Sequence, residues 1–266
     1  MSQPPSLLSN MMRIAGWIGL SVLLVAIFLS DFLAHAPAGA IMSGAELNPP
    51  SPAHPFGTDV LGRDILSETL HGLAQTGRHA IWAAAVAIVM GGLFGAVATR
   101  LPRPLALLLR GLFRVLSAIP ALLLTVVLVG LFGHNFVALA AGLAAAPLGF
   151  IRAFDHVDLR APHTEYARAT GIPGLTLLKR DLTYDFRHIL GSVIARALAA
   201  VTIILSTASF LGFGAQPPAR DLGLIIAAAK ASYLSAWWTA FFPGLALVFF
   251  VLCARLAAGL EEGERA

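Results

Sequence analysis

Charged residues and cysteine are both scarce in this chain. Only 12% of its 266 residues are Asp, Glu, Lys or Arg, and 58% are hydrophobic. Soluble domains average about 25% charged residues, so a soluble protein of this composition would lack polar surface. The single cysteine, Cys253, excludes a disulfide framework within the chain and lies in an apolar run, as a buried small side chain would. The composition therefore indicates a membrane protein.

The sequence also lacks the patterns expected of several catalytic classes. It has no phosphate-binding loop of the form GxxxxGK[ST] and no HExxH, so we expect neither nucleotide hydrolysis nor zinc peptidase chemistry in this chain. The eight histidines are scattered, and no grouping of them indicates a metal site or a bound cofactor. The centres of three apolar runs carry no charged residue, which argues against an intramembrane protease and a proton-relay transporter. We expect the chain not to be an enzyme.

Six apolar runs are candidates for membrane spans. A span needs roughly 20 apolar residues to cross a hydrocarbon core about 30 Å thick. The third run extends N-terminally toward Leu105 and the fifth toward Ile189. The predicted spans are Ile14–Ser30, Ala80–Thr99, Val115–Gly133, Asn135–Ile151, Ala197–Phe213 and Ala231–Ala254. The predicted fold is all-α, with six transmembrane helices.

The distribution of basic residues predicts the orientation of these spans. Cytoplasmic loops of membrane proteins are enriched in Lys and Arg. Of the 18 basic residues, the alternate segments that we assign to the outside hold only Arg63, Arg78, Arg220 and Lys230. The sequence therefore predicts that both termini are cytoplasmic.

Three connections are long enough to carry function. The outer segment Asp31–His79 begins rich in proline, and from Thr58 its apolar residues recur at helical spacing, which predicts an amphipathic helix over Thr58–Leu70 capped by Thr58 or Asp59. We expect this helix to lie along the membrane surface, with Arg63 and Asp64 contacting neighbouring outer loops. The inner segment Arg152–His188 is the most charged. A second outer connection contains a predicted helix over Leu222–Tyr233.

Two further interpretations concern side chains in these segments. Trp237 and Trp238 stand at the outer edge of the sixth span, where an interfacial aromatic belt is the simplest explanation. Ser67, on the predicted amphipathic helix, is expected to be replaceable by alanine without effect.

Three motifs together resemble a known family. These are HPFGTDVLGRDILSETLHG (54–72), SFLGFGAQPPARDLG (209–223) and AWWTAFFPGLAL (236–247), in that order. They resemble the dipeptide, oligopeptide and nickel ABC permeases, in the second-permease branch of binding-protein-dependent transporters. Within the first motif, the residues that match the family's periplasmic signature are Gly57, Thr58, Asp59, Gly62, Arg63 and Asp64.

The inner segment contains a stretch similar to the family's cytoplasmic EAA loop, which docks on an ATPase subunit. The stretch is EYARATGIPGLTLLKRDLTYDF (165–186), and Thr170 and Thr183-Tyr184 replace an alanine and a Leu-Pro that are usual there. Charges along it are suited to fix register on a soluble partner. The expected coupling residues are Glu165, Tyr166, Arg168, Ala169, Gly174, Lys179 and Arg180.

The resemblance implies a type I ABC importer permease in the cell inner membrane. Residues 1–75 would hold the first span, the periplasmic segment and the amphipathic helix. Residues 76–266 would form the permease core with its coupling loop near 152–188. Implied partners are a second homologous permease, two cytoplasmic ATPases and a periplasmic solute-binding protein, and the cargo would be peptides, nickel or a metallophore. A secondary transporter and a non-transporting regulatory paralogue remain as alternatives.

Overall fold

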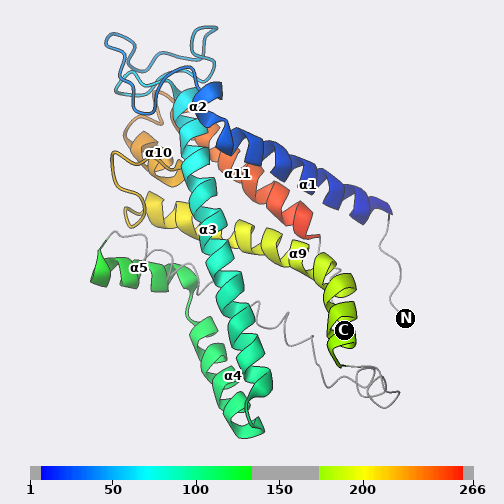
Figure 1. Cartoon of the computed structure of the whole chain (residues 1–266). Helices are drawn as coiled ribbons and strands as arrows, with labels where there is room; N and C mark the ends of the chain where they lie inside the picture. Colours follow the sequence, from blue (N-terminus) through cyan, green and yellow to red (C-terminus); the bar gives the residue numbers. More distant parts are fainter. Residues whose placement is uncertain (1–6, 134–173, 260–266) are drawn as a thin grey trace.

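The computed structural model describes residues 7–133 and 174–259, and these residues form helices and loops with one isolated β-bridge, between Thr58 and Asp64. Figure 1 shows their arrangement. The all-α prediction is confirmed for this part of the chain. The elements are α1 (Leu7–Phe28), α2 (Ser30–Leu33), α3 (Ile65–Arg100), α4 (Arg103–Ala118), α5 (Ala121–Phe132), α9 (Gly174–Phe210), α10 (Leu222–Ala228), the 3₁₀ turn η2 (Ala229–Ala231) and α11 (Trp238–Ala258).

Within the described residues, three helical stretches are long and apolar enough to cross a membrane. They are α1, the Gly191–Phe210 part of α9, and α11, and they correspond to the first, fifth and sixth predicted spans. The second predicted span, Ala80–Thr99, lies within α3. The fourth, Asn135–Ile151, falls outside the described residues. The total of six spans therefore stays a prediction.

The third predicted span is not one helix. The chain forms α4 and then the 12-residue α5, with a break at Ile119–Pro120. Proline lacks a backbone N–H and keeps the preceding residue away from helical geometry, which explains why the helix ends here. Pro120 therefore divides the predicted span Val115–Gly133 between two helices, and its crossing of the membrane stays a prediction.

The core lies where α1, α11, α9 and α3 meet, and Figure 1 shows α1 beside α11. Small residues allow this close packing: a Cβ added at Gly16 would overlap the backbone of Ala257. Apolar side chains also line the outward faces of these helices; Val248 is 61% exposed and Leu252 50%. Side chains of this kind on the outer face of a helical bundle are typical of contact with lipid or with another subunit.

The predicted amphipathic helix is not a separate element. Asp64 caps a single 36-residue helix, α3, that begins at Ile65 and runs on without a break through the second predicted span. Residues 58–64 form a tight loop before it, so Thr58 and Asp59 do not cap it. Asp64 is the N-cap because its carboxylate accepts a hydrogen bond from the backbone N–H of Ser67, three residues further along the chain.

Candidate functional site

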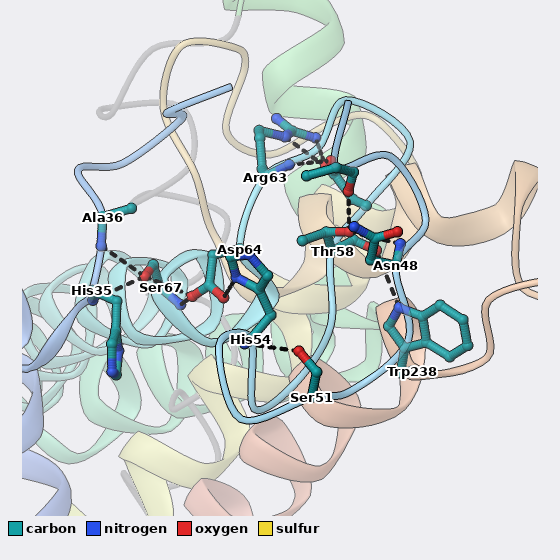
Figure 2. Close-up of polar contacts among 12 residues, drawn as sticks. His35, Ala36, Asn48, Ser51, His54, Thr58, Arg63, Asp64, Ser67 and Trp238 are labelled. Atoms are coloured by element: carbon teal, nitrogen blue, oxygen red, sulfur yellow. Dashed lines mark hydrogen bonds and ion pairs between the residues drawn. The ribbon is translucent and has the colours of Figure 1, made fainter. Parts of the chain in front are cut away.

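The loops at one end of the bundle form the candidate site, which we call the head and define as residues 34–64 and 211–237. Figure 1 shows residues 34–64 gathered above the start of α3. These residues contain the periplasmic signature, and Figure 2 shows their polar contacts. Thr58 is the first fixed point: its backbone N–H donates to Asn48 O (2.9 Å), and its Oγ1 accepts from Asn48 N (2.8 Å) and donates to Ala45 O.

Asp59 and Arg63 close the next turn of the loop. The Asp59 Oδ1 atom accepts from the backbone N–H groups of Leu61 (2.8 Å) and Arg63 (2.9 Å), and the Arg63 guanidinium forms an ion pair with Oδ2. Both side chains are almost buried. The predicted polar role of Arg63 is therefore met, but its closest partner lies within the same loop and not on a neighbouring one.

Two glycines of the signature are required by backbone geometry. Gly57 and Gly62 have φ values of 73° and 71°, a region that side chains disfavour. A Cβ at Gly57 would lie 2.7 Å from Asn48 O and 2.7 Å from the Trp238 ring, and one at Gly62 would overlap Met42 O. The signature glycines thus allow the loop to fold against itself.

Asp64 joins this loop to α3. Its Oδ2 accepts from Ser67 N (2.9 Å) and Ser67 Oγ (2.8 Å), and its Oδ1 lies 3.1 Å from His54 Nδ1. Ser67 Oγ in turn accepts from the backbone N–H groups of His35 and Ala36, both at 3.1 Å. The expectation that Ser67 is an inert position was wrong, because its hydroxyl links the segment after α2 to the start of α3.

Glu68 connects three segments that are distant in sequence. Its Oε1 accepts from Gly39 N (2.7 Å), its Oε2 accepts from Arg220 Nη1 (2.9 Å), and Arg63 Nη1 lies 4.0 Å away. Burial of the carboxyl raises the pKa of Glu68, against the lowering effect of the Gly39 N–H and Arg63. The ion pair with Arg220 therefore holds the two halves of the head together.

Asp221 connects α10 to the end of α9. Its Oδ1 accepts from Leu224 N (2.8 Å) and so caps the helix, and its Oδ2 accepts from the Ser209 hydroxyl at the end of α9. The next residue, Leu222, donates its N–H to Thr76 Oγ1 on α3 (3.1 Å). Burial raises the pKa of Asp221, although the bonds from Ser209 and Leu224 oppose this. The predicted helix over Leu222–Tyr233 is present as α10 followed by η2.

Trp238 corrects the prediction of an aromatic belt. Its side chain is buried, its Nε1–H donates to Thr58 O (3.1 Å), and the neighbouring Phe242 stacks on Phe56 at 4.0 Å. Only Trp237, which is 55% exposed, retains the exposure expected of an interfacial residue. Trp238 and Phe242 of the third motif therefore anchor α11 to the loop that carries the signature.

The structure describes only three of the seven predicted coupling residues. Glu165, Tyr166, Arg168 and Ala169 lie outside the described residues. Gly174 is the first residue of α9, and Lys179 and Arg180 lie in its N-terminal turns. The same helix ends at Phe210, next to the head.

Sequence reasoning missed Glu68, Arg220, Asp221 and Ser209. One signal was available: an Asp directly before an apolar run that begins at Leu222 is a typical helix start. Glu68 and Arg220 gave no such signal, since they are 152 positions apart. No cluster of His, Cys, Asp or Glu suited to a metal occurs among the described residues.

Comparison with known proteins gives the same family as the three motifs. A family model described as "Binding-protein-dependent transport system inner membrane component" matches residues 87–260. The dipeptide transport system permease protein DppC of Escherichia coli is 31% identical over 91% of this chain and 84% of its own length. The peptide transport system permease protein SapC of Haemophilus influenzae is 30% identical over 88% and 82%.

A putative peptide transport system permease protein of Brucella suis is 28% identical over 92% of this chain and 85% of its own length. The family match covers more than half of the chain and includes α9, α10 and α11. The chain therefore belongs to the family of inner-membrane permease components of binding-protein-dependent transport systems.

Proposed function

We propose that this chain pairs with a second, homologous permease to enclose a pathway for short peptides across the inner membrane. It would have six spans, the type I importer fold and both termini in the cytoplasm. Two cytoplasmic ATPases would bind the inner segment near 152–188, and a periplasmic binding protein would dock on the head. The chain itself would carry out no covalent chemistry and need no cofactor.

The observation that carries this proposal is the continuity of α9. The helix has 37 residues, a path of about 55 Å, which exceeds a hydrocarbon core of about 30 Å. Its first turns hold Gly174, Lys179 and Arg180 of the expected coupling segment. Its last turn holds Ser209, which is bonded to Asp221 in the head. One helix thus extends from the expected ATPase side to the expected docking side, with a bend visible in Figure 1.

Coupling follows if both ends of α9 respond to their partners. An ATPase that moves the Gly174 end would shift a helix packed against α3 and α11. The other end is tied through Asp221 to α10 and through Leu222 to Thr76. Packed elements change arrangement as units and not by continuous deformation. ATP binding on one side would therefore alter the head on the other.

Peptide is the proposed cargo because the similar proteins from Escherichia coli, Haemophilus influenzae and Brucella suis are named as dipeptide or peptide permeases. The test is uptake in proteoliposomes that contain both permeases, the ATPases and the binding protein. We expect ATP-dependent uptake of dialanine or trialanine. Uptake of nickel or a metallophore without peptide uptake would contradict the peptide assignment, and a complex that assembles but transports nothing would indicate a regulatory paralogue.

Gly174→Arg tests the coupling end of α9. A large charged side chain at the first helical position should block close approach of an ATPase, since small residues permit such contacts. We expect normal amounts of the permease pair, loss of ATPase subunits on co-purification and at least tenfold slower uptake. Exposed Ser43→Ala in the head is the control. Assembly and uptake equal to wild type in Gly174→Arg would refute the coupling assignment.

A further inference from the structure

A pocket of about 540 Å³ opens between residues of the head, Asp31 of α2 and one face of α3, and none of the roles described above uses it. Its walls come from the segment 31–38, from one face of α3 and from residues 218–220. The α3 residues are His71, Gln75 and Arg78, whose spacing places them on one side of a helix. The volume falls in the range of roughly 300–1,000 Å³ that is typical of small-molecule sites.

Hydrogen bonds to Ser67 and Glu68 of α3 hold the walls of this pocket in place. Ser67 Oγ accepts from His35 N and Ala36 N (3.1 Å each), and Glu68 accepts from Gly39 N (2.7 Å) and Arg220 Nη1 (2.9 Å). Figure 2 shows the His35 ring directed away from Ser67. A site whose walls are already fixed loses little conformational entropy when a ligand binds.

The pocket presents charges of both signs. Within the part of the chain that the structure describes, Arg78 makes no ion pair or hydrogen bond, and its side chain is exposed at the wall. Arg220 enters from the opposite segment, with its Nη1 on Glu68. Asp31, whose side chain is 84% exposed, lies at the wall with its Oδ1 3.4 Å from His71 Nδ1. The exposed guanidinium of Arg78 and the exposed carboxylate of Asp31 therefore line one cavity.

We propose that this pocket binds a short zwitterionic peptide before it enters the pathway. Arg78 binds the terminal carboxylate, Asp31 binds the terminal ammonium group, and Gln75 offers an amide to the peptide bond. A guanidinium suits a carboxylate because its N–H groups form two parallel hydrogen bonds. The alternative is that Arg78 extends toward lipid phosphates. That role would not require the pocket walls fixed by Ser67 and Glu68, nor the Asp31 carboxylate in the same pocket. This inference rests on the proposed import of peptides.

The test measures peptide binding to the complete permease–ATPase complex in nanodiscs, without the binding protein. The probes are tritiated dialanine, its C-terminal amide and its N-acetyl derivative. We expect Arg78→Gln to weaken dialanine binding by about tenfold or more, as loss of a charged hydrogen bond does, and to leave binding of the amide unchanged. Asp31→Asn should act in the same way on dialanine and leave the N-acetyl peptide unaffected.

Matched variants separate this result from a folding defect. Lys230→Gln removes an outer cation away from the pocket, where Nζ contacts the Phe210 ring and carbonyl, and should leave dialanine binding unchanged. Arg78→Lys retains the charge and should bind with intermediate affinity. All variants should elute from size exclusion as the intact complex.

Three outcomes would overturn the inference. They are equal dialanine binding by wild type and Arg78→Gln, no detectable dialanine binding by wild type, and an Arg78→Gln complex that binds dialanine normally but no longer binds the binding protein. The last result would show that the pocket accepts an acidic side chain of the binding protein. Uptake with the binding protein present is measured in parallel. If the wild type imports peptides but Arg78→Gln binds them normally, only the pocket assignment fails; if the wild type imports no peptide, the proposed function fails.

Discussion

Three buried carboxylates in and next to the head each join separate segments of the chain. Asp64, Glu68 and Asp221 are all less than 9% exposed, and each carboxylate accepts hydrogen bonds from groups in other segments. A buried carboxylate without such donors would strongly destabilise the fold. These three residues are therefore the positions in the head and at the start of α3 where a single substitution should have the largest effect.

Asp64→Ala removes the cap of α3 and the partner of His54. Loss of the cap alone costs about 0.5–2 kcal/mol, and the lost hydrogen bond between Asp64 Oδ1 and His54 Nδ1 adds to that cost. We expect a clearly lower melting temperature of the purified complex in fluorescence-detected size exclusion. Asp64→Asn should retain part of the cap, and Ser43→Ala should melt like wild type. A melting temperature of Asp64→Ala within error of Ser43→Ala would rule out this role.

Asp221 predicts how stability changes with pH. Its pKa is raised above its ordinary value of 3.8 by burial; the hydrogen bond from the Ser209 hydroxyl opposes this most strongly, and the facing His79, whose own pKa is lowered by burial, opposes it least. A carboxyl with a raised folded-state pKa holds its proton more tightly when folded, so its stabilising contribution is complete at pH below about 3.8 and is lost as the pH rises through the folded-state value.

The measurement is the difference in unfolding temperature between wild type and Asp221→Asn over a pH series. Titrating groups that do not interact with Asp221 cancel in this difference, whereas His79, which faces Asp221, does not. We expect the wild type to lose stability relative to Asp221→Asn as the pH rises above about 4. A difference that is constant, or that changes in the opposite direction, would show that burial does not dominate at this carboxyl.

At the scale of elements, helix packing depends on small residues at a few crossings. Gly16 of α1 lies against the backbone of α11 at Leu256 and Ala257, and Gly19 lies against the Cys253 side chain. The lone cysteine is thus a packing residue. Gly223 of α10 lies against the Ser206 carbonyl of α9 in the same way. Close approach of this kind is the main source of association between helices in lipid, where the hydrophobic effect contributes little.

Gly16→Ala tests the crossing of α1 and α11. Alanine favours an isolated helix over glycine by about 1 kcal/mol, so any loss of stability must come from packing. We expect a lower melting temperature, because the new methyl group overlaps backbone atoms that cannot rotate away. Gly244→Ala in α11 is a matched control, since nothing lies within 4 Å of its added Cβ. A stabilised Gly16→Ala protein would show that the two helices are not in this contact.

At the scale of the whole molecule, one side of the bundle is fixed by the head, whereas its apolar flanks are exposed. The segments of the head are joined to each other and to the helices by the Glu68–Arg220 pair and the Trp238–Thr58 bond. The flanks present side chains such as Leu245, which is 53% exposed. Apolar surface of this kind suits contact with lipid and with the second permease that we propose as partner.

Topology is the prediction at this scale. In a Cys253→Ala background, single cysteines at Ser2 and Glu264 should be shielded from an impermeant thiol reagent in spheroplasts, and one at Ser51 should react. The reasons are the bias of basic residues toward one side and the exposed position of Ser51 in the head. Labelling of either terminus without lysis would contradict the six-span arrangement with both ends inside.

The sequence by itself determined the membrane class, the helical content and the family, because hydropathy, proline, glycine and motif spacing act locally along the chain. It also located α1, α11 and the apolar part of α9, with starts six or seven residues from those observed and ends two to four residues away. Tertiary structure alone decided that Trp238 is buried under Thr58, that Glu68 meets Arg220 and that Arg78 faces a pocket. These contacts join residues up to 180 positions apart, and no periodicity encodes which distant group a buried donor will find.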